Sequence, residues 1–515
     1  MSTDRAATAG DGLAVRRLSA PTMIAYGFGQ VGEALMGVGF STFLLFYYQQ
    51  VIGVSGTITA TALALSLIID SLCDPLVGSL SDKIRTRWGR RHPFMLAAIV
   101  PLCVGFYCLF NPPAALTQAG YFLWLTAFAI ITRQAVTLFH VPQLALGAEM
   151  ARDYTQRSTM YSFNVLFSYL SAGVGAALAY RAFFPTTPQF SPGLLNPAGY
   201  HNFSLSFAAV MLIAILVCAF GTWREIPHLL VRAEGRAAPG AGTVRKRSSL
   251  PQLFMQMLRE FQAAFRNKSF KSVFFGMMLA TLMLAVEGVF NPYMGVHFWG
   301  LTTEQISLLP ILSVIGLFGS LALIIPVTRW LDKKMTLIWC SVIAIINGNL
   351  LIMLRLFTPD WFPANHSPLI LPFIAVTAFV GGLMGPLIFA TLNSMFADIV
   401  DEHELETGQR QEGIVFAARS FAVKVTSSVG LVVGGWLLDV IAFPKGAQAG
   451  TVHADVLWNL GLIVGPATSI FVMIGVFMYL GYGLDRVRHQ EIVVALNSQR
   501  DAAAAAAAGS EVAAG

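Results

Sequence analysis

Long apolar stretches separated by short polar ones dominate the sequence. Twelve of these stretches approach or exceed the length of about 20 residues at which an α-helix crosses the hydrocarbon core of a bilayer. They lie at 21–50, 57–81, 93–111, 119–147, 158–182, 202–223, 270–298, 305–328, 335–357, 368–397, 413–442 and 455–484. The pattern predicts an all-α membrane protein with twelve transmembrane helices.

One hydrophilic stretch, residues 224–269, is much longer than the others and divides the predicted spans into six and six. It is rich in Arg, Gly, Pro and Ser, as expected of a linker between two bundles. The basic turn at 82–91, after the second span, has a weaker counterpart at 329–334, after the eighth. This echo indicates a parallel repeat of two six-helix bundles. The predicted parts are an N-terminal segment at 1–20, an N-terminal bundle at 21–223, the linker at 224–269, a C-terminal bundle at 270–484 and an Ala-rich tail at 485–515.

The composition agrees with a membrane protein and excludes an ordinary soluble domain. Of the 515 residues, 56% are hydrophobic and 12% are charged, whereas soluble domains carry about 25% charged residues. The net charge of +6 comes mainly from Lys and Arg in loops, so it indicates membrane orientation and not a nucleic-acid surface. The five cysteines lie in apolar stretches without metal-ligand spacing, and we expect them to be small buried side chains.

Lys and Arg are distributed unevenly between the two sets of loops. The loops at 82–92 and 329–334 are rich in both residues, whereas those at 49–56, 112–119 and 299–303 contain neither. Cytoplasmic loops carry the excess of positive charge in membrane proteins. We therefore predict a multi-pass protein of the cell membrane with both termini in the cytoplasm.

Two acidic residues interrupt the second predicted span. Asp70 and Asp74 are four positions apart, so both carboxylates lie on one helical face. A carboxylate inside the bilayer is costly and normally faces a cavity or a partner charge. The pair is therefore a candidate site for a proton or for Na⁺, in which case the two aspartates are its metal ligands. A structural ion pair with a neighbouring cation is the alternative.

Polar residues also interrupt the fourth predicted span. Arg133, Thr137 and His140 recur at i, i+4 and i+7 and share one helical face. Arg133 either pairs with Asp70 or Asp74 as part of the bundle, or it receives an anionic group of the substrate, which its planar guanidinium suits. The second reading favours a uronide or another acidic substrate.

Isolated polar residues occur in the fourth, fifth, seventh and eleventh spans. Glu287 and Lys424 belong to the second half of the chain, and we expect them to pair across a central cavity, permanently or until substrate binds. Gln143 and Asn164, like His140, are expected to form hydrogen bonds between helices or to contact substrate.

Charged clusters of opposite sign flank the membrane on the predicted cytoplasmic side. The loop at 82–92 is basic, the stretch at 398–412 is acidic, and a further arginine lies near the same end of the eleventh span. We predict ion pairs among these groups in only one of two access states. The candidate gating residues are Asp82, Arg87, Arg90, Arg91, Asp401, Glu404 and Arg419.

Four motifs give the chain a family resemblance. They are Y-G-F-G-Q-V-G at 26–32, D-P-L-V-G-S-L-S-D with T-R-W-G-R-R-H-P-F at 74–94, H-V-P with L-G-A-E-M at 140–150, and F-A-D-I-V-D-E-H-E-L-E-T-G-Q-R-Q-E-G at 396–413. On these motifs the chain resembles the glycoside–pentoside–hexuronide:cation symporters, the branch of the major facilitator superfamily that includes the melibiose and glucuronide carriers. The resemblance implies the major facilitator fold in both halves.

The resemblance also carries functional residues, with differences. Asp70 and Asp74 fall at the family's cation-binding acids, and Lys424 falls at a lysine of the melibiose carrier. His140 replaces a sugar-binding acid, Glu33 lies one position before another, and an arginine of the melibiose carrier aligns with Asn164. These differences mean that a melibiose-like galactoside is not implied. The candidate substrate-binding residues are Glu33, Arg133, His140, Gln143, Asn164, Glu287 and Lys424.

We therefore expect a secondary active transporter that moves a sugar, glycoside or hexuronide together with Na⁺ or H⁺ by alternating access. F-H-V-P at 139–142 also resembles lysophospholipid-carrying relatives, so an amphiphile or organic anion is the alternative substrate, and a sensor without transport is a third reading. No Walker, H-E-x-x-H or G-x-S-x-G motif indicates an enzyme. We expect no cofactor beyond the coupling ion, no nucleic-acid partner, and a monomer that contacts its substrate and the lipid bilayer.

Overall fold

The structure is a computed structural model that describes residues 18–84, 86–151, 154–228, 265, 267–357, 361–364, 367–407 and 412–499. Within these ranges the chain is helical and forms no β-strand, apart from a single bridge between Thr86 and Gly89. Most of the predicted linker and the tail after residue 499 lie outside the described residues. The predicted division into domains therefore stays a prediction.

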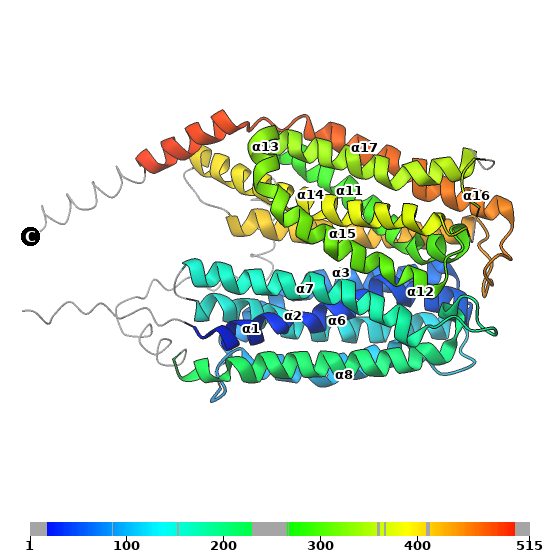
Figure 1. The fold of residues 1–515 in the computed structure, drawn as a ribbon. Coiled ribbons are helices and arrows are strands. Elements are labelled where there is room, and N and C mark those ends of the chain that lie inside the picture. The colour runs from blue at the N-terminus through cyan, green and yellow to red at the C-terminus, as the bar shows by residue number, and fades with distance from the viewer. Residues whose placement is uncertain are drawn as a thin grey trace, which may run out of the picture.

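The described part of the N-terminal half covers residues 18–228 and contains the first six spans (Figure 1). Its helices are α1 (Ala20–Phe28), α2 (Gln30–Val38), η1 (Gly39–Leu44), η2 (Tyr47–Ile52), α3 (Gly56–Lys83), α4 (His92–Ala97), α5 (Ile99–Leu109), α6 (Gln118–Met150), α7 (Tyr154–Phe183), η3 (Gly193–Leu195), α8 (Pro197–Thr222) and η4 (Trp223–Glu225).

The described part of the C-terminal half covers residues 265–499, with the gaps given above. Its helices are α11 (Lys268–Tyr293), η5 (Met294–Phe298), α12 (Thr303–Ile306), α13 (Leu308–Phe357), α14 (Ile370–Thr407), α15 (Glu412–Val440), α16 (Ala454–Leu462), η6 (Ile463–Ala467) and α17 (Thr468–Tyr479). Residues 486–499, in the predicted tail, form a further helix. The side chains of Ile492 and Leu496 are buried and pack this helix against the C-terminal half.

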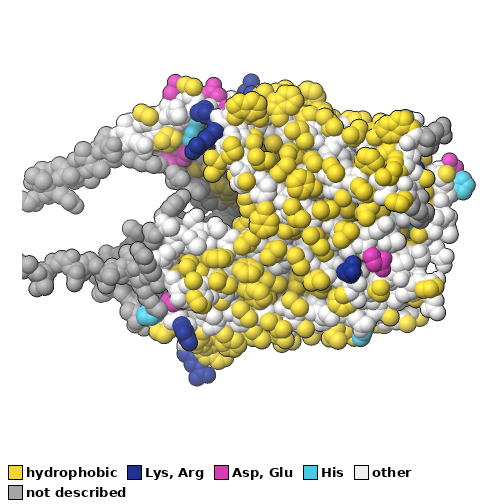
Figure 2. Space-filling model, in the orientation of Figure 1, with side chains coloured by type: hydrophobic (Ala, Val, Ile, Leu, Met, Phe, Trp, Pro, Cys, Tyr) yellow, Lys and Arg dark blue, Asp and Glu magenta, His cyan; other side chains and the backbone are white. Residues whose placement is uncertain are grey.

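The described residues contain the twelve predicted crossings. Eleven helical stretches are long and apolar enough to span a membrane. The longest, Thr303–Phe357, consists of two passes, because Asp332 inside α13 has φ 63° and ψ 161°, which are not helical values. The chain doubles back there (Figure 1). Figure 2 shows hydrophobic side chains over the middle of the molecule, with most charged ones toward one end.

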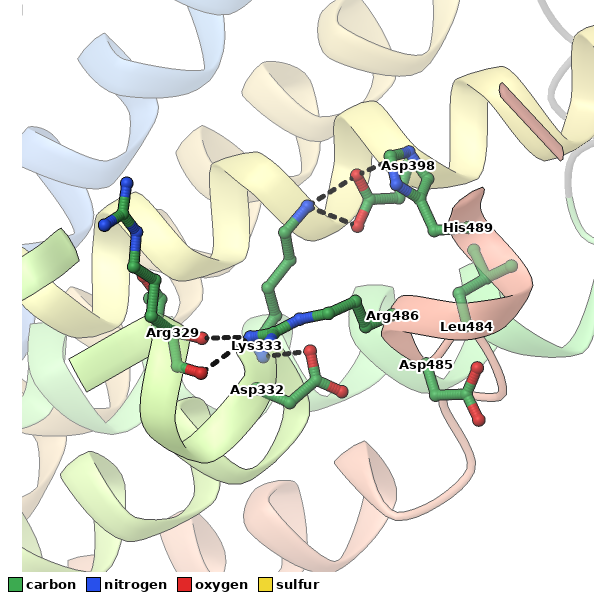
Figure 3. A pocket seen from close by; sticks show the side chains of 9 residues that line it. Arg329, Asp332, Lys333, Asp398, Leu484, Asp485, Arg486 and His489 are labelled. Carbon is green, nitrogen blue, oxygen red and sulfur yellow. Dashed lines mark hydrogen bonds and ion pairs between the residues drawn. The ribbon is translucent and has the colours of Figure 1, made fainter. Parts of the chain in front are cut away.

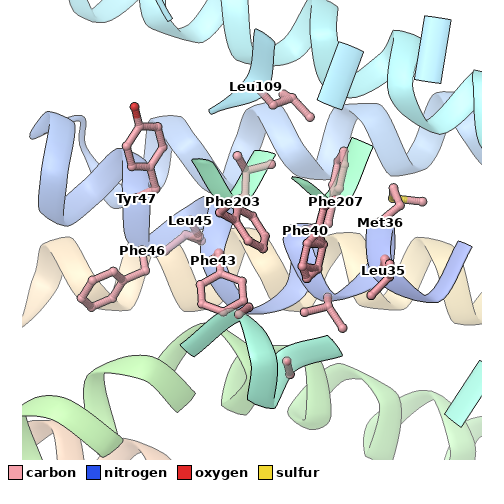
Figure 4. Close-up of a cluster of buried hydrophobic side chains, with 14 of the residues drawn as sticks. Leu35, Met36, Phe40, Phe43, Leu45, Phe46, Tyr47, Leu109, Phe203 and Phe207 are labelled. Atoms are coloured by element: carbon pink, nitrogen blue, oxygen red, sulfur yellow. The ribbon is translucent and has the colours of Figure 1, made fainter. Parts of the chain in front are cut away.

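Turns of π-helix interrupt the first, seventh and twelfth spans. They are η1 and η2 in the first span, η5 in the seventh and η6 in the twelfth. Such turns are rare and frequently accompany functional sites. η1 directs Phe40 and Phe43 into the N-terminal half, where Phe43 contacts Phe203 at a centroid distance of 5.0 Å (Figure 4). This aromatic core holds the first span in place beside the polar residues described below.

The helix bundle has two ends. The start of α1 and the helix at 486–499 lie at the same end, on the left of Figure 1, which is called the terminal end, and the opposite end is called the far end. At the far end, Asp439 of α15 accepts hydrogen bonds from Ser55 Oγ at 2.6 Å and from the backbone nitrogens of Gly56 and Thr57 at 3.0 and 2.8 Å. First-turn N–H groups lack an intrahelical acceptor, so a carboxylate from the other half satisfies them.

A second acidic residue also joins the two halves at the far end. Glu304 of α12 accepts from the backbone nitrogen of Thr186 at 2.7 Å and from its hydroxyl at 2.9 Å. In addition, Gln50 donates to the carbonyl of Pro444 at 2.9 Å. The space-filling view is hollowed between the halves at the terminal end (Figure 2). The far end of the bundle is therefore closed by bonds between the halves.

Close contact between α3 and α15 depends on two glycines. A Cβ atom on Gly435 would collide with the backbone of Gly56 and with Ala60, and a Cβ on Gly56 would lie 2.7 Å from the carbonyl oxygen of Gly435. Small residues let membrane helices approach backbone to backbone. These glycines bring together the two helices that carry the ionised cluster described next.

Candidate transport site

An ion cluster joins the two halves midway along α3 and α15. Nζ of Lys424, on α15, lies 2.8 Å from Oδ2 of Asp70 and 2.6 Å from Oδ2 of Asp74, both on α3. Thr137 of α6 donates to Oδ1 of Asp70 at 2.7 Å and lies 3.2 Å from Oδ1 of Asp74. The helical spacing of four predicted for the two acids places both on the face that meets α15 and α6.

The two carboxylates of this cluster differ in exposure. The side chain of Asp70 is 8% exposed, whereas that of Asp74 is 36% exposed and that of Lys424 is 26% exposed. Separating a buried ion pair is costly, because each partner then leaves an uncompensated charge in the protein interior. The ammonium group of Lys424 occupies the space between the acids, so a mobile cation binding both must compete with it. Asp74, the more exposed of the two carboxylates, is the one that a cation from solvent could reach.

Arg133 lies next to this cluster on α6 and uses other partners. Its Nε donates to Ser66 Oγ at 3.1 Å, and the Ser66 hydroxyl donates to the carbonyl of Leu63 at 2.6 Å. The guanidinium also lies 4.6 Å from the centroid of the Phe40 ring. Among the described residues, its two terminal nitrogens form no ion pair. The predicted pairing of Arg133 with the aspartates is thus replaced by a hydrogen bond and a cation–π contact.

Glu33 and His140, predicted as separate sugar contacts, lie against each other. Nδ1 of His140 is 2.6 Å from Oε2 of Glu33, and the side chains are 28% and 35% exposed. Nε2 of Gln30 lies 3.3 Å from the same Nδ1 and donates to Oε1 of Gln143 at 2.9 Å. Gln143 in turn donates to the carbonyl of Tyr26 at 2.8 Å. The fourth span thereby joins the first through a continuous polar network.

The remaining predicted substrate residues lie in other surroundings. Asn164 is buried beside Tyr26. Glu287 lies beside Thr468, the first residue of α17. The expected pair between Glu287 and Lys424 is not formed, because Lys424 turns toward the aspartates of the opposite half. Apolar sequence around both residues gave no signal that would distinguish these partners.

Candidate gating residues of the N-terminal half cluster at the terminal end. Arg91 is buried and pairs with Asp82 and, at 2.8 Å, with Glu149. Arg90 pairs with Glu149 at 2.8 Å as well. Arg87 lies beside Trp88, with 5.7 Å between its guanidinium carbon and the ring centroid. These ion pairs lie within one half, so the predicted pairing with the acidic stretch of the other half stays a prediction for a different state.

The terminal end of the C-terminal half contains a charged pocket of about 250 Å³ (Figure 3). Lys333 pairs with the buried Asp398 at 2.7 Å. His489, from the helix at 486–499, lies 3.3 Å from Asp398 and 3.6 Å from Asp401. Tyr482 donates to Asp398 at 3.1 Å, and burial together with this carboxylate raises the pKa of the phenol, which keeps its proton. The segment after α17 is thereby held on the bundle.

The other two gating candidates of the C-terminal half are Arg419 and Glu404. Arg419, on α15, lies over the rings of Phe389 and Phe396 at 5.1 and 5.6 Å. Glu404 lies at the end of α14 and is half-buried. Among the contacts described, none joins the acidic stretch at 398–412 to the arginines of the basic loop at 82–92.

Several residues of these clusters were missed from the sequence. Ser66 precedes Asp70 by four positions, so helical spacing was the available signal. Gln30 and Glu149 stand inside two of the motifs but were not singled out. Asp439 gave no signal, because its partners at the start of α3 are more than 380 positions away.

The described residues contain no group of three or more His, Cys, Asp or Glu side chains arranged to hold a metal ion. Asp70 and Asp74 supply carboxylate oxygens, and Thr137 adds a hydroxyl oxygen beside them. Oxygen donors of this kind suit a hard cation such as Na⁺ and equally suit a proton. The cluster thus supplies oxygen donors from three side chains beside the ammonium group of Lys424.

Comparisons with known proteins identify the family and the fold of the chain. A family model described as MFS/sugar transport protein, where MFS is the major facilitator superfamily, matches residues 25–486. The inner membrane symporter YicJ of Escherichia coli is 24% identical over 425 residues, covering 82% of this chain and 83% of that protein. The glucuronide carrier protein homolog of E. coli is 22% identical over 498 residues, covering 94% and 97%. The xylose transporter XylE from E. coli, solved in an inward open conformation, superposes with a TM-score of 0.53 at 15% identity over 90% of this chain and 95% of that one, which shows a common fold.

Proposed function

The chain belongs to the MFS/sugar transport protein family, and from this premise we propose that it couples a cation to the transport of a sugar, glycoside or hexuronide. Proteins of this family are transporters, and the major facilitator fold carries substrate by alternating access around a central site. Symport requires that cation and substrate bind cooperatively and that the loaded site changes the contact between the halves. The proposal concerns which residues meet these requirements here.

The bridge from Lys424 to Asp70 and Asp74 is the observation that carries the proposal. It joins the two halves through charges that a cation can replace. In the proposed cycle, a cation enters beside Asp74 and displaces the ammonium group from the carboxylates. The ion pair across the halves is then broken, and the halves are free to rock about the site. Loss of the cation on the other side restores the pair.

The charge of Arg133 favours a substrate that carries an anionic group. Together, the two aspartates, Lys424 and Arg133 carry no net charge in their usual ionised forms. Binding of one monovalent cation and one monoanion preserves that balance, whereas a neutral sugar leaves a positive charge in a poorly solvated place. A hexuronide or another acidic glycoside is therefore our preferred substrate, with its carboxylate on the guanidinium.

The closed far end defines the state of the proposed cycle. We propose that the termini lie in the cytoplasm, as the distribution of Lys and Arg predicts. The bonds of Asp439 and Glu304 then close the extracellular side, and the site is accessible from the cytoplasm. Opening toward the outside requires Asp439 to give up the N-terminus of α3 and Glu304 to give up Thr186 in the loop after α7.

Uptake into proteoliposomes tests the proposal. Radiolabelled glycosides, hexuronides and a lysophospholipid are offered under an imposed Na⁺ gradient and, separately, under an imposed pH gradient. We expect a hexuronide or glycoside to accumulate under one of the two gradients. This accumulation should be lost in Asp74→Asn. Asp455→Asn is the matched control, because that aspartate is 87% exposed at the far end. Accumulation that is intact in Asp74→Asn would place the coupling cation elsewhere.

The lysophospholipid distinguishes the alternative substrate class. Its uptake in the absence of any sugar uptake would replace the glycoside by an amphiphile within the same fold. Uptake of neither class under either gradient would contradict the proposed transport function itself.

A further inference from the structure

Nδ1 of His140 faces two groups that require opposite protonation states. Oε2 of Glu33 lies at 2.6 Å and Nε2 of Gln30 lies at 3.3 Å. A carboxylate oxygen and an imidazole nitrogen approach to 2.6 Å only with a proton between them, because two lone pairs repel. An amide nitrogen, in contrast, is a donor and contacts a ring nitrogen that has no proton. The same atom is therefore placed for both states.

The orientation of Gln30 follows from the chain of hydrogen bonds behind it. The carbonyl of Tyr26 accepts, so the group of Gln143 that faces it is the amide nitrogen. Oε1 of Gln143 then faces Gln30, and Gln30 must present its nitrogen there. That nitrogen carries two hydrogens, of which one is used on Gln143 and the second points to His140. A backbone carbonyl thus fixes Gln30 as a donor to the unprotonated ring.

Glu33 stabilises the protonated ring in the same place. Its Oε2 is shielded from solvent and, apart from the 2.6 Å ion-pair contact with Nδ1, has no described hydrogen-bond partner. No hydrogen bond to its Oε1 or to Nε2 of His140 is described either. With a proton on each ring nitrogen, His140 offers an N–H donor at Nε2 beside a carboxylate acceptor at Oε1. One sugar hydroxyl, or two neighbouring ones, can bind to such a donor and acceptor. In the neutral ring only one nitrogen carries a proton, so either the contact of Nδ1 with Glu33 or the N–H donor at Nε2 is lost.

From this geometry we propose that Glu33 and His140 form a proton-binding site of the transport cycle, distinct from the Asp70–Asp74 pair. The proton binds to Nδ1 of His140 from water on one side of the membrane and returns to water on the other, and no other bond forms or breaks. The substrate binds to the protonated pair, so proton and sugar move in the same direction. This inference rests on the proposed transport function: the Asp70–Asp74 pair keeps the cation that displaces Lys424, and the proton on His140 is carried in addition to it.

The site is electrostatically linked to the contact between the halves. The charges that act on His140 are those of Glu33 on α2, Asp74 on α3 and Lys424 on α15. A proton on His140 attracts Asp74 and repels Lys424, so it weakens the ion pair that joins the halves. Binding of the proton thus favours the rearrangement that proposed transport requires. Gln30 and Gln143 add neutral donors and acceptors to the same surroundings.

Nitrogen NMR of the histidine rings tests the site without any substrate. Protein labelled with ¹⁵N-histidine is titrated in lipid nanodiscs, and the signal absent from His140→Asn is assigned to His140 among the nine histidines. We expect Glu33→Gln to lower the titration midpoint of His140 by about one to three pH units, because the carboxylate is in contact with the ring. We expect Gln30→Leu to raise it, because that variant loses the donor to the unprotonated ring.

The control variant is His453→Asn. His453 forms an exposed pair with Asp455 at 3.3 Å, and its removal is expected to leave the His140 midpoint unchanged. A purely structural role for the pair predicts no opposite shifts in the two variants. A midpoint that is the same in wild type, Glu33→Gln and Gln30→Leu would overturn the proton site.

Uptake of the transported sugar provides the second arm. Accumulation driven by an imposed pH gradient is expected to fail in His140→Asn and to persist in His453→Asn, whose histidine is exposed and far from the pair. Accumulation in wild type that follows the Na⁺ gradient alone would overturn the coupling role. If wild type moves no sugar at all, the proposed function fails, and the NMR titration still decides whether the proton site exists.

Discussion

Nζ of Lys424 lies 2.6 Å from Oδ2 of Asp74, although 350 positions separate them in the chain. This contact joins the two halves midway along α3 and α15, and the hydrogen bonds of Asp439 join the same two helices at the far end. One pair of helices, α3 and α15, thus carries both the ionised cluster and a closure of the bundle. A charge change in the cluster therefore acts directly on the helices that hold the far end shut.

Substitution of Lys424 tests the bridge. In Lys424→Ala the two carboxylates face each other without their resident cation, so the interaction across the halves is lost. We expect accumulation of the transported sugar to fall by about tenfold or more, within the range of coupling energies between sites. Lys424→Arg keeps the charge and should retain part of the activity. Equal accumulation in Lys424→Ala and wild type would mean that the bridge takes no part in coupling.

Arg133 is expected to determine the preference for acidic substrates. Arg133→Gln removes the charge while keeping a polar side chain beside Ser66, and charge-assisted hydrogen bonds contribute about 1.5–3 kcal/mol. We expect uptake of a hexuronide to fall at least about tenfold relative to uptake of the matching neutral glycoside. Ser66→Ala, which leaves the charge in place, should change this ratio less. A ratio that does not respond to Arg133→Gln would remove the anion-binding role.

Asp439 is expected to hold the far end closed. Spin labels on the exposed positions Ala114 and Lys445, one in each half, report the width of that end by pulsed electron resonance. In Asp439→Ala the N–H groups of Gly56 and Thr57 lose their acceptor, so a longer distance should gain population. Asp455→Asn should leave the distance distribution as in wild type. A distribution unaffected by Asp439→Ala would show that the remaining contacts suffice.

Gly435 allows a steric test of the same closure. Gly435→Val places a side chain against the backbone of Gly56, so α3 and α15 cannot approach as they do here. We expect the far-end distance to lengthen and transport to stop, because the closed state is no longer reached. Gly381→Val is the matched control, since a Cβ at Gly381 meets nothing within 4 Å. Normal transport by Gly435→Val would contradict the requirement for this contact.

Lys333 is expected to stabilise the terminal end of the C-terminal half. Lys333→Ala removes the cation that faces Asp398, whose side chain is 6% exposed. An unpaired buried carboxylate is costly, so the melting temperature of the detergent-solubilised protein should fall by several degrees. Lys445→Ala, at an exposed position, should leave it unchanged. An unchanged melting temperature in Lys333→Ala would indicate that His489 and Tyr482 compensate for the lost charge.

The sequence determined those features that repeat along one helix. Apolar length predicts the twelve spans, because the thickness of a bilayer fixes the number of residues needed to cross it. Helical periodicity places Asp70 with Asp74, and Arg133 with Thr137 and His140, because positions four or seven apart share a face whatever the helix packs against. The motifs indicated the family, since they are local strings of residues. These properties do not depend on how distant segments meet.

The tertiary structure alone decided which charges are partners. Lys424 was expected opposite Glu287 but lies against Asp70 and Asp74, and Arg133 contacts Ser66 and Phe40. Each of these contacts joins helices that are far apart in the chain. Their geometry follows from side-chain packing, such as the approach of α3 to α15 at Gly56 and Gly435, which a single sequence does not encode as a local pattern. The pairing of Glu33 with His140 arises in the same way, because it depends on how α2 of the first span packs on α6, the fourth span.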